Sequence, residues 1–228
     1  MIGIFDSGYG GLTIMQALRL RLPEFDYVYL GDNARAPYGV RSKDEIYELT
    51  RDGVAWLFAR GATVVILACN TASANALSRL QNEWLPKYFP DRRVLGILVP
   101  TVEAVTGAAW QGQAVKNGAP TNAVIFATPA TVASHAYTRE ITKRNPAVHV
   151  VEQACPTLVP LIEQGAHPDV IKAEVTKCVD EARAQSAVWP PDVVVLGCTH
   201  YALIADLFKA QTHGAVVYAH GTLTADAF

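Results

Sequence analysis

The chain has 228 residues, of which 50% are hydrophobic and 18% charged, and its formal net charge is -2 at pH 7. This length and composition predict one large folded domain or two small ones and argue against disorder. The charge argues against a nucleic-acid partner, no segment reaches eighteen apolar residues without polar breaks, and "MIGIFDSGYGG" (1–11) lacks the features of a secretion signal. We therefore expect a cytoplasmic protein that acts on a small molecule, with no membrane partner.

Short apolar runs alternate with segments of helical periodicity along the chain. Eight runs have the length and β-branched composition of strands, at 1–5, 27–30, 63–68, 93–99, 122–127, 148–152, 192–197 and 215–219. Helices are predicted between them, notably over 42–61, which begins at a serine cap and ends at a glycine, and over 168–185, which begins at a proline. This alternation predicts an α/β fold with mostly parallel sheets that helices cover on both faces.

A weak internal repeat relates the two halves of the chain. "IFDSG" through "LACNT" and "IFATPATV" through "LGCTH" follow the same order of strand, Ser/Thr-rich loop, helices and a strand that ends in cysteine. The repeat predicts two similar lobes, with a junction near residues 99–121. Ligands of open α/β sheets lie beyond the carboxyl ends of the strands, where Cys69 and Cys198 fall. If the lobes face each other about a pseudo-twofold axis, the two thiols approach one cleft from opposite sides.

The four cysteines fall into two classes. In a reducing compartment we expect thiols rather than disulfides. Cys69 and Cys198 each follow a strand, precede polar residues and lie at the start of a predicted helix, which favours a carboxylate ligand and a lowered thiol pKa. Either alone could be a small buried hydrophobe, but the repetition indicates proton transfer on a carboxylate substrate. Cys155 and Cys178 are interpreted as packing residues.

Six sequence blocks carry a resemblance to a known family. They are "FDSGYGGLT" (5–13), "YLGDNARAPYGVRS" (29–42), "ACNTAS" (68–73), "TPATVASHAY" (128–137), "ACPTLVPLIEQG" (154–165) and "GCTHYALI" (197–204). In this order, over nearly the whole chain, they resemble the signature blocks of glutamate racemases. The resemblance implies a cofactor-independent, metal-free enzyme that interconverts L- and D-glutamate and supplies D-glutamate for bacterial peptidoglycan. It also implies two α/β lobes with the site between them, the first formed by residues 1–98 and 213–228 and the second by 99–212.

The resemblance also implies roles for particular residues. Cys69 and Cys198 would exchange protons with opposite faces of the α-carbon, assisted by Asp6 and His200 respectively. The other matching positions would bind substrate: Ser7, Pro37, Tyr38, Gly39, Asn70, Thr71, Thr199 and Glu163. The alternatives are a loop-capping role for Asp6, a helix-capping or core role for His200, and a solvated helix face for Glu163.

Three features depart from the family pattern. Ala202 stands where the family usually has proline, and Asn33 replaces a common threonine. The chain stops at "VVYAHGTLTADAF" (216–228), where the family continues into a final helix, so either the sequence is shortened or its terminus differs. Loss of a terminal helix would expose apolar surface on the first lobe.

Other functions remain open from the sequence. An aspartate racemase or a maleate isomerase of the same superfamily would keep both cysteines, although the first two blocks favour glutamate. A pyridoxal phosphate racemase needs a Schiff-base lysine, and no apolar run ends in lysine. A non-catalytic module could bind an amino acid, or a metal through Asp6, Cys69, Cys198 and His200. Oligomeric state, including a homodimer, and regulation by cell-wall precursors are also left open.

Overall fold

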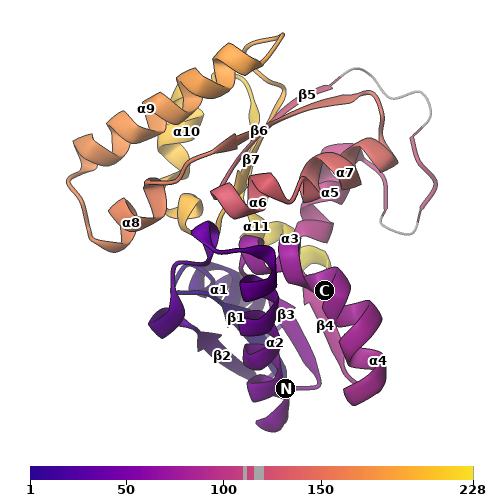
Figure 1. The fold of residues 1–228 in the computed structure, drawn as a ribbon. Coiled ribbons are helices and arrows are strands. Elements are labelled where there is room, and N and C mark those ends of the chain that lie inside the picture. The colour runs from indigo at the N-terminus through magenta and orange to yellow at the C-terminus, as the bar shows by residue number, and fades with distance from the viewer. Residues whose placement is uncertain (110–111, 116–120, 228) are drawn as a thin grey trace.

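The computed structural model describes residues 1–109, 112–115 and 121–227. Each half of the chain forms a four-stranded sheet flanked by helices (Figure 1). The strands are β1 (Ile2–Asp6), β2 (Tyr27–Gly31), β3 (Val64–Leu67), β4 (Arg93–Gly96), β5 (Thr121–Ala127), β6 (Val148–Ala154), β7 (Val193–Gly197) and β8 (Val216–Tyr218). The α-helices are α1 (Leu12–Arg21), α2 (Lys43–Ala59), α3 (Asn70–Arg79), α4 (Leu85–Tyr88), α5 (Leu98–Thr106), α6 (Pro129–Ala133), α7 (Ala136–Arg144), α8 (Leu158–Glu163), α9 (Pro168–Gln185), α10 (Ala205–Gln211) and α11 (His220–Ala227).

The two sheets have the same topology. Their strand orders are β2-β1-β3-β4 and β6-β5-β7-β8, and every paired strand is parallel. The order reverses between the two central strands of each sheet, and a crevice opens there at the carboxyl ends. The α/β fold with mostly parallel sheets, and the repeat that relates the two halves, are thereby confirmed.

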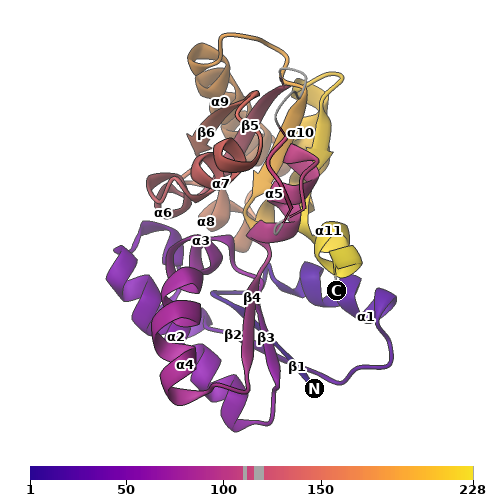
Figure 2. The same ribbon diagram turned by 90° about the vertical axis from the view of Figure 1, so that its right-hand side faces the viewer.

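The last helix links the two halves. α11 packs beside α1, which belongs to the first half, and also against α5 (Figure 2). Ala225 of α11 joins the apolar cluster that contains Ile14 and Leu18 of α1. β8 instead pairs with β7, with Val216 opposite Val193, so this strand completes the second sheet. The expected first lobe included residues 213–228, whereas the structure returns the chain to the first half only after Tyr218.

Two expected elements differ in detail from the structure. The apolar run 93–99 forms a strand only to Gly96, and its last residues begin α5, because an apolar run alone does not distinguish a strand from a buried helix. The expected junction at 99–121 is therefore partly helical, and its residues 110–111 and 116–120 lie outside the described residues. By contrast, α2 begins as predicted at Ser42, whose side chain forms a capping box with Glu45.

None of the helices within residues 1–109, 112–115 and 121–227 is long and apolar enough to cross a membrane.

Candidate active site

The carboxyl ends of the central strands of both sheets meet at one narrow cavity of about 60 Å³. The cavity brings together all but one of the residues predicted from the sequence. Its lining includes Ser7, Pro37, Tyr38, Gly39, Cys69, Asn70, Thr71, Glu163, Cys198, Thr199 and His200. The exception, Asp6, ends β1 and is buried next to Cys69, whose thiol interacts with its carboxylate.

Cys69 occupies the position between β3 and α3, immediately before the first turn of the helix. Its Sγ lies 3.3 Å from the Ser7 hydroxyl oxygen. The pKa of the Cys69 thiol is raised to about 11, because burial and then the nearby Asp6 carboxylate outweigh the hydrogen bonds from Ser7 and the backbone that lower it. Near neutral pH this thiol is therefore protonated and can act as an acid.

Asp6 is held by the loop that follows β1. Its Oδ2 accepts the Gly11 N–H at 2.7 Å and faces the Tyr29 hydroxyl at 3.5 Å, while Oδ1 has no hydrogen-bond partner in the described part of the chain. Burial raises the pKa of Asp6, although the Gly11 N–H and the charge of His200 act in the opposite direction. A carboxylate with a raised pKa is a stronger base, so Asp6 is suited to accept a proton from the Cys69 thiol.

The second thiol has a different assistant. Cys198 follows β7, and its Sγ lies 3.8 Å from Nδ1 of His200. The other ring nitrogen of His200, Nε2, lies 2.9 Å from Oε1 of Glu163. Because a carboxylate can only accept, Nε2 carries a hydrogen, and whenever the ring is neutral it is Nδ1 that presents its lone pair to Cys198. Glu163 thus contacts the His200 ring on the side away from the thiol, while 35% of its own side chain stays exposed to solvent.

Burial has the same effect on the second thiol as on the first. It raises the pKa of Cys198, and the proximity of Cys69 and Asp6 raises it further. The sequence favoured lowered thiol pKa values from the helix starts, and that expectation is wrong for this site. Loss of hydration destabilises a thiolate in a closed cavity more than the backbone N–H groups nearby stabilise it.

Hydroxyl and amide groups line the cavity between the thiols. Thr71 and Thr128 come from opposite halves of the chain, and their hydroxyl oxygens lie 3.0 Å apart. Thr128 also caps α6 and reaches Thr131 at 3.0 Å. A Cβ on Gly39 would lie 2.7 Å from Cβ of Thr128, so only glycine allows the 37–39 loop to approach this closely. These groups, with the start of α3, can hold the polar ends of an amino acid.

The chain that forms this cavity is similar in sequence to known proteins. The Asp/Glu/Hydantoin racemase family matches residues 13–225, which is nearly the whole chain. The chain belongs to this racemase family. Among its relatives, a glutamate racemase from Caulobacter sp. (strain K31) is 46% identical, over 99% of this chain and 83% of that protein.

Solved structures of this racemase family have the same fold. Glutamate racemase RacE1 from Bacillus anthracis matches with a TM-score of 0.83 at 26% identity, over 100% of this chain and 79% of that one. The Francisella tularensis glutamate racemase, solved in complex with D-glutamate, matches with a TM-score of 0.82 at 28% identity, over 99% of this chain and 78% of that one. The two parallel sheets that meet at a shared site are therefore the architecture of these racemases.

Several residues around this racemase site were not predicted from the sequence. Thr128 lines the cavity, and Cys155, interpreted as a packing residue, both packs in the second core and lines the cavity. Cys178 is a buried core residue, as expected. Asp32 was not predicted either: it accepts a hydrogen bond from the predicted Tyr38 at 2.5 Å, which fixes the loop that carries Pro37 and Gly39. The position of Thr128 directly after a strand was a signal that could have identified it, because ligands bind at such positions.

Proposed function

We propose that the protein is a cofactor-independent glutamate racemase that inverts the α-carbon by proton transfer between two cysteines. The observation that carries the proposal is the pair of buried thiols, one at the end of β3 and one at the end of β7, which line the same cavity from the two sheets. Each thiol has its own proton acceptor, Asp6 for Cys69 and His200 for Cys198. Inversion requires an acid and a base on opposite faces of the reacting carbon, and this pairing supplies both.

The reaction begins when one thiol transfers its proton to its acceptor and becomes a thiolate. The substrate ammonium favours this step, because a positive charge in a buried cavity lowers the pKa of a neighbouring thiol. The thiolate then takes the α-proton, and the thiol on the other face donates its own proton to the carbanion. One C–H bond breaks and one forms, no electrons are gained or lost, and the opposite enantiomer remains.

The cavity supports binding of the polar groups of the substrate as well. Ser7, Thr71 and Thr199 offer hydroxyls, Asn70 offers an amide, and the Pro37–Gly39 loop offers backbone groups. The first lobe comprises the chain to Ile97 together with α11, and the second comprises the sheet from β5 to β8 with its helices, including α5. The substrate is held between these lobes, so lobe closure would exclude water from the carbanion.

The names of the relatives support glutamate over other substrates of the superfamily, since both the similar sequence and the similar structures are called glutamate racemases. D-Glutamate made in the cytoplasm would enter peptidoglycan synthesis. For the metal-binding alternative, no three His, Cys, Asp or Glu side chains within the described ranges gather in a way that could hold a metal ion.

One assay tests the proposal. The purified protein is mixed with L-glutamate, and separately with D-glutamate, without added cofactor and after dialysis against a chelator, and circular dichroism is followed over time. We expect both signals to decay to zero. Aspartate in parallel separates the aspartate racemase alternative, and metal analysis of the undialysed protein separates the metal-binding module. No decay with glutamate, or faster decay with aspartate, would contradict the proposal.

A further inference from the structure

Asn70, which lines the cavity, accepts a hydrogen bond from a tyrosine that does not line it. The Tyr137 hydroxyl donates to Oδ1 of Asn70 at 2.7 Å, and both residues are buried. The Asn70 amide nitrogen, Nδ2, is also buried, and in the described part of the chain it has no hydrogen-bond partner. Since the two atoms of an amide point in different directions, anchoring Oδ1 leaves the NH₂ group as a donor for the cavity that Asn70 lines.

Tyr137 is in turn connected to α11. His220 lies with Nε2 at 3.4 Å from the Tyr137 hydroxyl oxygen and with Nδ1 at 2.7 Å from the Thr101 hydroxyl oxygen. The single hydroxyl proton of Tyr137 goes to Asn70, so its oxygen accepts from His220. The neutral ring then carries its hydrogen on Nε2, and its Nδ1 faces the Thr101 hydroxyl, whose single proton can go either to Nδ1 or to the Ile97 carbonyl oxygen 3.1 Å away. The donors therefore run in one direction from His220 through Tyr137 to Asn70.

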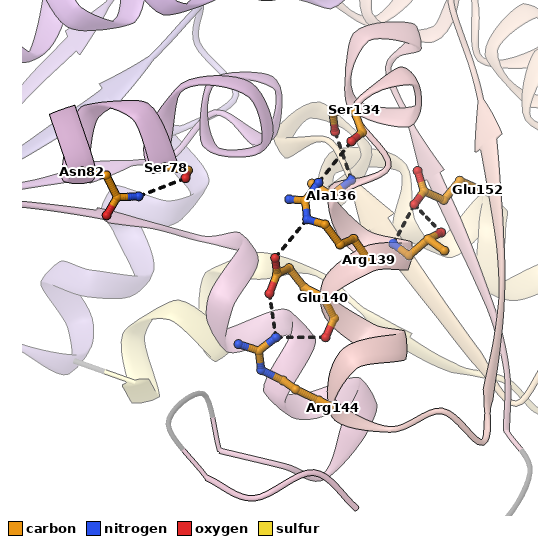
Figure 3. A network of polar contacts seen from close by, with 9 residues as sticks. Ser78, Asn82, Ser134, Ala136, Arg139, Glu140, Arg144 and Glu152 are labelled. Atoms are coloured by element: carbon orange, nitrogen blue, oxygen red, sulfur yellow. Dashed lines mark hydrogen bonds and ion pairs between the residues drawn. The ribbon is translucent and has the colours of Figure 1, made fainter. Parts of the chain in front are cut away.

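The helix that carries Tyr137 is fixed by contacts on its other side. The Ser134 hydroxyl accepts the Ala136 N–H at 3.2 Å where α7 begins (Figure 3). Glu152 of β6 accepts both the backbone N–H and the hydroxyl of Thr138, at 2.7 and 2.6 Å. Near the end of α7, Arg144 pairs with Glu140 at 2.7 Å (Figure 3). These contacts hold α7 in place, and α7 in turn holds Tyr137 at the position from which its hydroxyl contacts Asn70.

We propose that Tyr137 and His220 are positioning residues that orient the Asn70 amide toward the substrate and connect this orientation to α11. The inference rests on the proposed racemase function for the role of Asn70, but the hydrogen-bond chain itself does not. It follows that α11 has a part in substrate binding, although the helix does not line the cavity. Neither residue touches the reacting atoms.

A double-mutant cycle tests whether Tyr137 acts through Asn70. Tyr137→Phe should raise KM for glutamate about tenfold and change kcat much less, because Asn70 binds the substrate in the ground state and the transition state alike. In the Asn70→Ala background the same change should alter kcat/KM by less than about twofold. Additive effects of the two changes would overturn the proposal. His220→Gln should give a smaller rise in KM than Tyr137→Phe, and an unchanged KM would remove His220 from the chain.

Tyr27→Phe is the matched control, because the Tyr27 hydroxyl donates to the Leu18 and Leu22 carbonyls, away from the cavity. It should leave KM unchanged, and an equal rise in KM would show that the effect of Tyr137→Phe is only structural. A second readout needs no turnover: the NMR signal of the Asn70 side-chain amide, identified by its loss in Asn70→Ala. It should shift in Tyr137→Phe and not in Tyr27→Phe. If wild type fails to racemise glutamate, the proposed function fails, and an unmoved amide signal would still overturn the hydrogen-bond chain.

Discussion

At the scale of single residues, the two thiols share a cavity but are prepared for reaction differently. Cys69 lies beside Asp6, a buried carboxylate whose pKa is raised. Cys198 lies beside the His200 imidazole, which contacts Glu163. Both thiols have raised pKa values, so each is protonated near neutral pH, and in the proposed mechanism the substrate and the acceptor favour the thiolate. This asymmetry predicts different consequences for changes on the two sides of the cavity.

Replacing either cysteine by serine should abolish racemisation, because a hydroxyl is too weak an acid or base near pH 7 to replace the thiol. The remaining thiol still faces one side of the α-carbon. By the family resemblance, Cys69→Ser should slowly exchange the α-proton of L-glutamate through Cys198, and Cys198→Ser that of D-glutamate through Cys69. Proton NMR in heavy water measures this exchange. Substantial racemisation by either variant, or exchange of the same enantiomer by both, is incompatible with the two-cysteine mechanism.

The two proton acceptors, Asp6 and His200, are tested by replacing each with asparagine, whose amide does not accept a proton near neutral pH. Asp6→Asn and His200→Asn should each lower turnover by roughly 10²-fold, the usual size of lost acid–base assistance, without unfolding the chain. Glu163→Gln should have a smaller effect, because it leaves the imidazole in place and removes only its orienting charge. L- and D-glutamate have equal free energy in water, so kcat/KM must fall equally in both directions. Full turnover both ways in a variant would show that its residue is structural only.

At the scale of elements, α11 brings a buried histidine into the region where the halves meet. Burial lowers the pKa of His220 to about 4, and the Leu196 and Ile97 carbonyls offset this only in part. The folded pKa lies below the unfolded value of 6.5, so the stabilisation that comes from the neutral ring is present above about pH 6.5 and is lost as the pH falls toward 4. By pH 5 this loss amounts to about 2 kcal/mol.

Urea denaturation of wild type and His220→Gln at pH 7 and pH 5 measures this contribution. Other groups titrate alike in both proteins, so the difference between their pH dependences isolates the histidine. Wild type should lose about 2 kcal/mol more of its free energy of unfolding than the variant between the two pH values. Equal losses would mean that the ring is protonated at little cost, and hence that it is not buried as a neutral group.

The elements themselves were largely predictable from sequence, because strand composition and helix caps are local signals. Ser42 and Glu45 made the start of α2 evident, and the two cysteines marked the ends of β3 and β7. The contact of Tyr137 with Asn70 was not predictable, since it joins residues 67 positions apart through the packing of α7 on α3 and carries no local pattern. The contact of His220 with Tyr137 was not predictable for the same reason, because it forms only where α11 packs back against the rest of the chain.

At the scale of the whole molecule, the repeat predicted two similar sheets, and the repeated order of strands confirms it. The repeat did not predict where the chain crosses back. β8, which contains Val216, pairs with β7 and forms the edge of the second sheet. Only α11, which follows it, packs on α1. Each half contributes one thiol to the cavity, so the proposed mechanism needs both halves at once, and a label that distinguishes the two faces of the substrate can test it.

Reaction in heavy water provides that label. If the thiol that removes a proton is not the one that returns a proton, the inverted product should carry solvent deuterium from the first turnover, while unconverted substrate carries little early in the reaction. This follows because a proton taken by Cys69 or Cys198 remains on one lobe, and the new proton comes from the thiol on the other lobe, already exchanged with solvent. Mass spectrometry after separation of the enantiomers measures both pools, starting from L- and from D-glutamate. Equal early labelling of substrate and product would indicate a single base that reaches both faces, and the placement of one thiol on each lobe would then have no catalytic role.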